Sequence, residues 1–460
     1  MHSSFNASRS SESRPQRRFA AIAGRVAIAI AGSIALSTCS TDLGLASFRC
    51  TDTDPSCPGG YYCATGTCVR YGSTLPALLA TTVAESDSAF SLHPRAHDLL
   101  VCWNQGLSSR IPGVFSATVA RTGEVTQVAT SLTGTDPASI SAIAGERGDC
   151  SWNGTETIAA VSRHTTGNES YRTQLYSTNA MGVSTEFGAA MLQTYATPRL
   201  TDTLSAIVGN QTWFMVSRYL SNAANLPLGF YFISIDPDRT THATTARIAT
   251  FTTTDFLTST ELHAGTNGAW LAAILQRGET TFVWVDAMAP QLSDAHAPVL
   301  PFRAPATSGY VVAYPLAAHG NQLAVAYGFG GGQWQIRWLA PDPANDPPPG
   351  PMITLATDVV RPGGFVDGDN LLIAGVANGT DGNADATHVS VWQLPWGSSA
   401  APTAHSTIEK LSLVPARRLQ LTRVDGQLFA VWTERVPATE SGATEYTALY
   451  SSPVSDTPGP

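Results

Sequence analysis

The chain has 460 residues and a formal net charge of −9, with 43% hydrophobic and only 13% charged residues. This composition excludes an intrinsically disordered chain, and the acidic balance argues against a nucleic-acid-binding protein, which needs basic residues to displace phosphate counterions. The length exceeds that of one ordinary hydrophobic core, so it predicts either several domains or a repeat architecture.

The N-terminus has the pattern of an export signal. Arg14, Arg17, Arg18 and Arg25 precede a short apolar run at 26–36. A helix that spans a bilayer needs about 20 apolar residues, so this run is too short to cross a membrane and is typical of a signal peptide. We therefore expect residues 1–38 to be removed during export.

The next residues, LSTC at 36–39, resemble the lipobox of bacterial lipoproteins, with Thr38 in place of the usual Gly, Ala or Ser. The resemblance implies cleavage before Cys39 and a lipid anchor on that cysteine. Because Ser40 and not Asp follows, it also implies sorting to the outer membrane of a Gram-negative cell envelope. The alternative is an ordinary secretory signal, with Cys39 paired in a disulfide or incidental.

Residues 39–74 form a second region, which is rich in Gly, Asp, Thr and Pro and too short for a core of its own. An exported protein forms disulfides, so we expect two bridges among four cysteines, with all three connectivities open. These cysteines are Cys50, Cys57, Cys63 and Cys68. The segment resembles the short Cys-rich modules that follow the lipobox in some bacterial surface lipoproteins, and a four-cysteine zinc site is the competing interpretation. Cys102 and Cys150 then pair by elimination.

A repeat of about 55 residues fills the rest of the chain. In each repeat a turn precedes a strongly apolar strand, and six of the seven turns contain a glycine next to Asn or Asp, as two-residue hairpins require. The seven apolar strands start at Leu99, Thr157, Trp213, Trp270, Leu323, Leu371 and Leu428.

A second strand starts 11 to 19 residues after the start of each apolar strand, and a third, less regular stretch comes next. With the strand before the turn, each repeat has four strands, which predicts an all-β fold, a seven-bladed β-propeller at 75–452 with a tail at 453–460. A pair of β-sandwiches would show no fixed period. The second strands start at Val114, Thr173, Gly229, Thr281, Trp334, His388 and Thr447.

The seventh repeat runs out of chain before its fourth strand, whereas LLATTV at 78–83 belongs to no repeat. An open propeller exposes strand edges that pair with other chains. We therefore expect residues 78–83 to complete the last blade and close the ring, and we expect a monomer. The alternative is that this segment is a linker.

Three local patterns could form chemistry-bearing sites. Residues 110–112 repeat the R-I-P motif of sialidases, but the Asp-box of that family is missing. Asp381, Asn383 and Asp385 have the spacing of a calcium loop, but Ala386 and Trp392 stand where glycine and glutamate are expected. Five tryptophans in strands are expected to be blade core, namely Trp103, Trp213, Trp270, Trp284 and Trp432.

No catalytic constellation, cofactor fingerprint or metal-ligand cluster emerges from the sequence, so it predicts no catalytic residue and no cofactor. The leading hypothesis is a non-enzymatic envelope protein that uses one propeller face to bind a protein or carbohydrate ligand. The alternatives are an extracytoplasmic propeller enzyme, such as a glycosidase or lyase, and a structural envelope protein. Buried, closely spaced carboxylates or histidines in the central channel would favour the enzyme.

Overall fold

The computed structural model describes residues 61–64, 67–70, 76–81, 83, 90–105, 113–132, 147–165, 170–179, 182–194, 198–220, 229–247, 255–265, 268–277, 280–288, 310–329, 332–340, 343–355, 361–377, 388–410, 416–436 and 446–455. The chain divides into two units, Met1–Leu43 and Gly44–Pro460, and every described residue belongs to the second. The expected signal peptide and Cys39, Cys50 and Cys57 lie outside the described residues. No helix in the described ranges is long and apolar enough to span a membrane.

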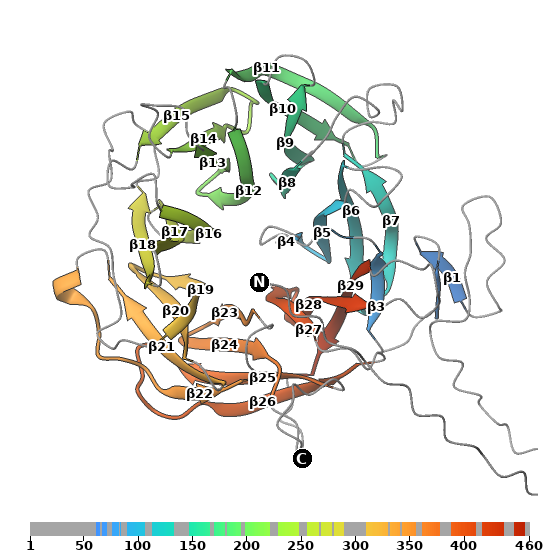
Figure 1. Ribbon diagram of the computed structural model, residues 1–460. Helices are drawn as coiled ribbons and strands as arrows, with labels where there is room; N and C mark the ends of the chain where they lie inside the picture. The colour runs from blue at the N-terminus through green and yellow to red at the C-terminus, as the bar shows by residue number, and fades with distance from the viewer. Residues whose placement is uncertain are drawn as a thin grey trace, which may run out of the picture. The chain divides into compact units, whose positions relative to one another are not determined.

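The described strands form one two-stranded hairpin and seven larger antiparallel sheets, which are the blades of a propeller (Figure 1). The hairpin consists of β1 (Tyr61–Ala64) and β2 (Thr67–Arg70), in which Cys63 lies opposite Cys68. The first blade consists of β4 (Phe90–Pro94), β5 (Asp98–Gln105), β6 (Gly113–Ala120) and β7 (Val125–Ser131), and the second of β8 (Arg147–Trp152), β9 (Thr157–Thr165), β10 (Ser170–Thr178) and β11 (Ser184–Thr194). The third blade consists of β12 (Pro198–Val208), β13 (Gln211–Leu220), β14 (Gly229–Ile235) and β15 (Thr241–Arg247). The fourth consists of β16 (Asp255–Gly265), β17 (Gly268–Arg277) and β18 (Thr280–Met288).

The last three blades complete the ring. The fifth blade consists of β19 (Tyr310–His319), β20 (Gln322–Phe329), β21 (Gln333–Leu339) and β22 (Met352–Thr354). The sixth consists of β23 (Gly363–Asp367), β24 (Asn370–Gly375), β25 (His388–Pro395) and β26 (Thr403–Glu409). The seventh consists of β27 (Ala416–Val424), β28 (Gln427–Val436), β29 (Tyr446–Val454) and β3 (Ala77–Ala80). A single 3₁₀ turn, η2 (Pro343–Asn345), is the one helical element of the described residues.

The seven blades and their strand order confirm the predicted propeller. Each expected apolar strand is the second strand of its blade, and each expected second strand follows it as the third. In the fourth blade the described residues contain three strands where four were expected. At the β27–β28 turn both Asp425 (φ 45°) and Gly426 (φ 79°) have positive φ, as a type I′ hairpin requires.

The first strand of each blade lies innermost, and each inner strand contacts the next around the ring: β4, β8, β12, β16, β19, β23, β27 and again β4. The close approach of these strands depends on glycine at two positions. A Cβ on Gly363 would lie 2.4 Å from the carbonyl oxygen of Leu419, and one on Gly364 would lie 2.5 Å from Cβ of Leu316. Residues 363–364 therefore let the sixth blade pack against both of its neighbours.

The hydrophobic core consists of separate clusters between neighbouring blades, as expected for a fold in which each unit packs on the next. Four of the five tryptophans expected in the core are buried, namely Trp103, Trp213, Trp270 and Trp432. Trp284 lies on β18, but its side chain is outside the description. The indole N–H of Trp103 donates to Gln105, and that of Trp213 donates to Gln211, so each buried ring keeps a polar partner.

The ring is closed by pairing between its two ends, as predicted from the sequence. The N-terminal strand β3 pairs with β29 and becomes the fourth strand of the last blade. Strand β3 itself ends at Ala80, but the backbone N–H of Val83 still donates to the carbonyl oxygen of Thr447 on β29, at 2.9 Å, and Val83 also bridges to Gln105 of the first blade. The last strand runs to Val454, past the expected end of the propeller at 452.

Candidate functional site

A cavity of about 310 Å³ lies inside the ring and is lined by residues from all seven inner strands. Its polar lining comes from the seventh, first, second, third and fourth blades, whereas the fifth and sixth blades contribute apolar and glycine residues. The polar residues are Ser91, His93, Asp149, Ser205, His263, Arg418, Gln420 and Thr422. The apolar side is formed by Leu316, Ala317, Ala318, Gly364, Phe365 and Val366. The cavity is therefore amphipathic, with polar groups on one arc and hydrocarbon on the other.

Asp149 is the centre of a hydrogen-bond network that joins three blades. The side chain is 6% exposed. Its Oδ1 accepts hydrogen bonds from the Ser91 hydroxyl of β4 and from the backbone N–H of Cys150 at 2.8 Å. Its Oδ2 lies 2.8 Å from the Ser205 hydroxyl of β12, which also lies 2.7 Å from the carbonyl oxygen of Cys150. Burial raises the pKa of Asp149 to about 6, although these hydrogen bonds oppose the shift.

His93 is connected to the same network through Ser91. Its Nε2 lies 2.9 Å from the Ser91 hydroxyl oxygen. Because Ser91 donates its single proton to Asp149, the imidazole Nε2 must carry the hydrogen and donate to Ser91. Burial lowers the pKa of His93 to about 4, so the ring is neutral at pH 7. This order differs from a Ser-His-Asp triad, in which histidine lies between the other two and accepts the serine proton.

His263, on β16, lines the cavity from the fourth blade. Its Nε2 is buried and has no hydrogen-bond partner among the described residues. Burial also lowers the pKa of His263 to about 4. His263 therefore contributes to the wall a neutral imidazole with one unsatisfied nitrogen, and an unsatisfied buried polar group is costly.

Arg418 brings a positive charge to the cavity wall. The residue is 7% exposed, and its guanidinium carbon lies 5.1 Å from the centre of the Phe90 ring. Gln420 follows on the same strand and donates to the carbonyl oxygen of Phe90 at 3.4 Å. A second arginine, Arg361, bridges to Arg418 through the backbone and lies over Tyr314, but it is not part of the cavity lining.

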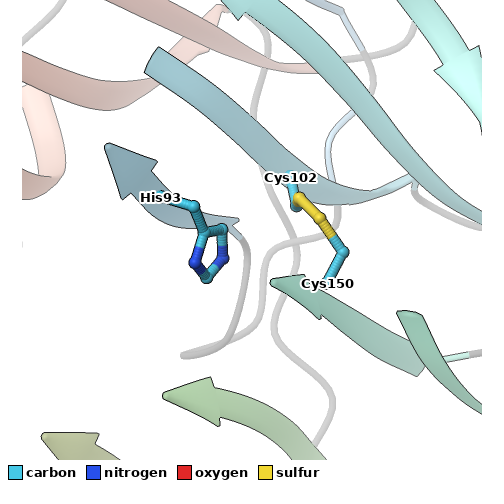
Figure 2. A group of neighbouring side chains, drawn as sticks. All are labelled: His93, Cys102 and Cys150. Atoms are coloured by element: carbon cyan, nitrogen blue, oxygen red, sulfur yellow. A yellow bond between two sulfur atoms is a disulfide. The ribbon is translucent and has the colours of Figure 1, made fainter. Parts of the chain in front are cut away.

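Behind this wall the structure joins Cys102 of β5 and Cys150 of β8 in a disulfide, with the Cα atoms 6.0 Å apart (Figure 2). It is the bridge expected from the sequence, and it links the first blade to the second. His93 points toward it, and the ligand atoms of the three residues lie within 4.8 Å of one another. Both sulfurs are bonded to each other, so neither is a thiolate, and the group lacks the soft ligands that a metal would need there.

The residues of this cavity were missed by the sequence analysis. Ser91, Asp149, Ser205, His263 and Arg418 lie far apart in the chain, and none belongs to a known motif. The available signal was weak: each lies on the strand before the hairpin turn of its repeat. The sialidase-like residues 110–112 and the calcium-like Asp381, Asn383 and Asp385 lie outside the described residues.

No protein-family model and no curated protein sequence matches the chain. Solved structures do resemble it. The polysaccharide lyase Uly1 is 11% identical, with 81% of this chain and 90% of that chain covered at a TM-score of 0.45. The periplasmic gluconolactonase PpgL of Pseudomonas aeruginosa is 12% identical, with 76% and 91% covered at 0.44. The N10 neuraminidase-like protein of A/little yellow-shouldered bat/Guatemala/060/2010 is 9% identical, with 83% and 99% covered at 0.40.

These identities are too low to transfer a function, and the TM-scores are too low for an argument from detailed geometry. The likeness concerns the arrangement of antiparallel sheets alone. By its own sheet topology, this chain is an all-β protein with seven propeller blades around a polar-sided central cavity.

Proposed function

We propose that this protein is a lipid-anchored protein of the cell envelope that binds a small polar molecule of about monosaccharide size in the central cavity of its propeller. The observation that carries the proposal is the convergence of all seven inner strands on one amphipathic cavity. Its volume of about 310 Å³ lies within the range of small-molecule sites. Sugars have hydroxyl edges and hydrocarbon faces, which match the polar and apolar arcs of this wall.

The polar groups of the wall differ in how far the protein itself satisfies them. Asp149 already accepts three hydrogen bonds, from Ser91, Ser205 and the Cys150 backbone, so its carboxylate is held in place by the protein. The buried Nε2 of His263, by contrast, has no hydrogen-bond partner among the described residues.

A calorimetric titration of the purified protein with a panel of monosaccharides tests the proposal. Ala264 lines the cavity and is exposed, so Ala264→Trp fills the cavity without disturbing the core. We expect this variant to lose binding, whereas Ala401→Trp, at an exposed position between β25 and β26, keeps it. Binding that survives Ala264→Trp would place the ligand elsewhere, and no heat with any sugar would refute the proposal.

A propeller enzyme acting in the same cavity is the second candidate. It is favoured by three titratable groups on one cavity wall, since burial raises the pKa of Asp149 to about 6 and lowers the pKa of His93 and His263 to about 4. An enzyme would convert the bound sugar or a polymer of it. Mass spectrometry of the sugar after prolonged incubation separates the two candidates, because conversion that Asp149→Asn abolishes would show catalysis.

The envelope location is part of the same proposal. It is supported by the basic and apolar segments that precede the lipobox-like residues at 36–39. A disulfide between Cys102 and Cys150 fits a protein that folds in an oxidising compartment.

A further inference from the structure

A row of four polar contacts runs through the cavity wall and joins the first three blades. It begins at Nε2 of His93, which lies 2.9 Å from the Ser91 hydroxyl oxygen, and that oxygen contacts Oδ1 of Asp149. It continues from Oδ2 of Asp149 to the Ser205 hydroxyl oxygen at 2.8 Å, and from there to the carbonyl oxygen of Cys150 at 2.7 Å. Each contact joins two polar atoms at hydrogen-bond distance, so each needs a hydrogen of its own.

The neighbours of Asp149 supply only three hydrogens for these four contacts. His93 supplies one from Nε2, Ser91 and Ser205 supply one each from their hydroxyl groups, and a carbonyl oxygen supplies none. If Asp149 is ionised, the single hydrogen of Ser205 has two acceptors, Oδ2 of Asp149 and the carbonyl oxygen of Cys150. One of the two contacts then lacks a hydrogen, unless Asp149 itself carries it.

We propose that Asp149 takes up a proton on Oδ2 and donates it to Ser205, which forms a pH-dependent hydrogen bond between the second and third blades. Ser205 then donates to the carbonyl oxygen of Cys150, and all four contacts are hydrogen bonds. Oδ1 still accepts from the Ser91 hydroxyl and from the backbone N–H of Cys150. When the proton leaves, Ser205 satisfies only one of its two neighbours, and the junction between β8 and β12 loses a hydrogen bond. This link belongs to the fold and does not depend on the molecule that the cavity binds.

The surroundings of Asp149 favour its neutral form. Strands β4, β5, β6, β9, β12 and β13 pack against β8. Among their described side chains the titratable groups are His93 and Asp98, besides a disulfide-bonded cysteine. His93 is neutral at pH 7, because burial lowers its pKa to about 4, and Asp98 is paired with Arg95. Burial is therefore the largest influence on the pKa of Asp149 and raises it to about 6, although hydrogen bonds oppose the shift.

NMR of the full chain with carbon-13 in its aspartate carboxyl groups can follow the titration of Asp149, whose signal is assigned by its absence in Asp149→Asn. We expect a midpoint at about pH 6 or above. Ser205→Ala should lower this midpoint by about one pH unit, because it removes the acceptor of the Asp149 proton. Ser91→Ala is the matched control and should raise the midpoint, because it removes a donor that stabilises the carboxylate more than the acid.

The direction of the shift in Ser205→Ala decides the inference. A midpoint that rises in this variant, as in Ser91→Ala, would show that Ser205 donates to a carboxylate and would overturn the proposal. A wild-type midpoint below pH 5 would overturn it as well. Both measurements are made without a ligand, so their outcome is independent of sugar binding.

If Ser205→Ala fails to fold, stability at pH 8 provides the test. Asparagine has an N–H group that can donate to Ser205 at every pH, as the protonated Oδ2 of Asp149 does. Asp149→Asn should therefore unfold at a urea concentration no lower than that of the wild type, whereas Asp149→Ala should unfold at a lower one. An Asp149→Asn protein as unstable as Asp149→Ala would refute the proposed proton.

Discussion

Leu78 of β3 lies opposite Tyr450 of β29 in antiparallel register, although 372 residues of chain separate them (450 − 78). This pairing gives the last blade its fourth strand and ties the N-terminal end of the propeller to its C-terminal end. It removes two strand edges that would otherwise be open to another chain.

A chain that starts at Ala84 should lose this closure, whereas a chain that starts at Leu75 keeps it. Ala77, Leu78, Leu79 and Ala80 are all buried, so we expect the shorter chain to lose about 3 kcal/mol of stability or more and to associate through the exposed edge of β29. Urea unfolding and size-exclusion chromatography measure both effects. Two chains with the same midpoint and the same elution volume would contradict the closure model.

Removal of the Cys102–Cys150 disulfide should destabilise the propeller. The bridge closes a loop of 48 residues between the first two blades, and disulfides of this kind contribute about 2–4 kcal/mol. The double variant Cys102→Ser/Cys150→Ser should therefore unfold at lower urea concentration than the wild type. Reduced wild-type protein is the control and should unfold at a urea concentration no higher than that of the variant, because reduction also opens any bridges among Cys50, Cys57, Cys63 and Cys68. An unchanged midpoint after complete reduction would show that the bridge adds nothing.

Stability should fall as the pH is lowered from 6.5 toward 4. Burial lowers the pKa of His93 and His263 from 6.5 to about 4, so the unfolded chain takes up these protons first. Burial raises the pKa of Asp149 from 3.8 to about 6, so the folded chain takes up this proton first and the group adds stability as the pH falls. The stability lost through the two histidines exceeds the stability gained through the one aspartate. Urea midpoints measured between pH 7 and pH 4.5 should therefore show a net loss of stability.

Variants separate these contributions to the pH dependence. Asp149→Asn removes the opposing group, so the loss of stability on acidification should become steeper. His263→Gln should make it shallower, because it removes a histidine whose pKa burial lowers to about 4. If the loss of stability on acidification is the same in Asp149→Asn, in His263→Gln and in the wild type, the cavity residues are not the origin of the pH dependence.

The buried ion pair between the sixth and seventh blades should be costly to break. Lys410, which is the single lysine of the sequence, lies 3.0 Å from Glu434, and their side chains are 0% and 2% exposed. The indole of Trp432 also donates to Glu434, at 2.7 Å. Glu434→Gln leaves the ammonium group buried without its counter-charge, so we expect a loss of about 3–5 kcal/mol in the free energy of unfolding.

A second ion pair joins the same two blades and provides the control for this prediction. Arg423 and Asp367 are 2.7 Å apart, but their side chains are 23% and 36% exposed. Asp367→Asn should therefore cost less than about 1 kcal/mol. Equal losses in Asp367→Asn and Glu434→Gln would mean that burial does not decide the strength of these pairs.

Cys39 is expected to carry the lipid anchor. Cys39→Ser removes the thiol to which a diacylglycerol group would be attached, so the protein should leave the membrane fraction and lose labelling by a fatty-acid probe. Ser37→Ala, a neighbouring small-to-small change in the same lipobox-like segment, should retain both. A Cys39→Ser protein that is still labelled would disprove lipidation at this position.

The sequence alone determined the strand order and the number of blades, because both follow from local patterns. Hairpin turns such as Asp425-Gly426 and apolar strands such as that from Leu428 depend on residues close together in the chain. The same reasoning identified the closing strand near Leu78, because the seventh repeat lacked its fourth strand and the strand before the first repeat belonged to no repeat.

The cavity was decided by the tertiary structure. Ser91 and Asp149 are 58 residues apart and belong to different blades, so no local pattern indicates that they share a hydrogen bond. Each lies on the inner strand of its own blade beside other polar residues, so the local sequence does not single it out. Only closure of the ring brings the seven inner strands together, and with them Ser91, Asp149, Ser205, His263 and Arg418 around one cavity.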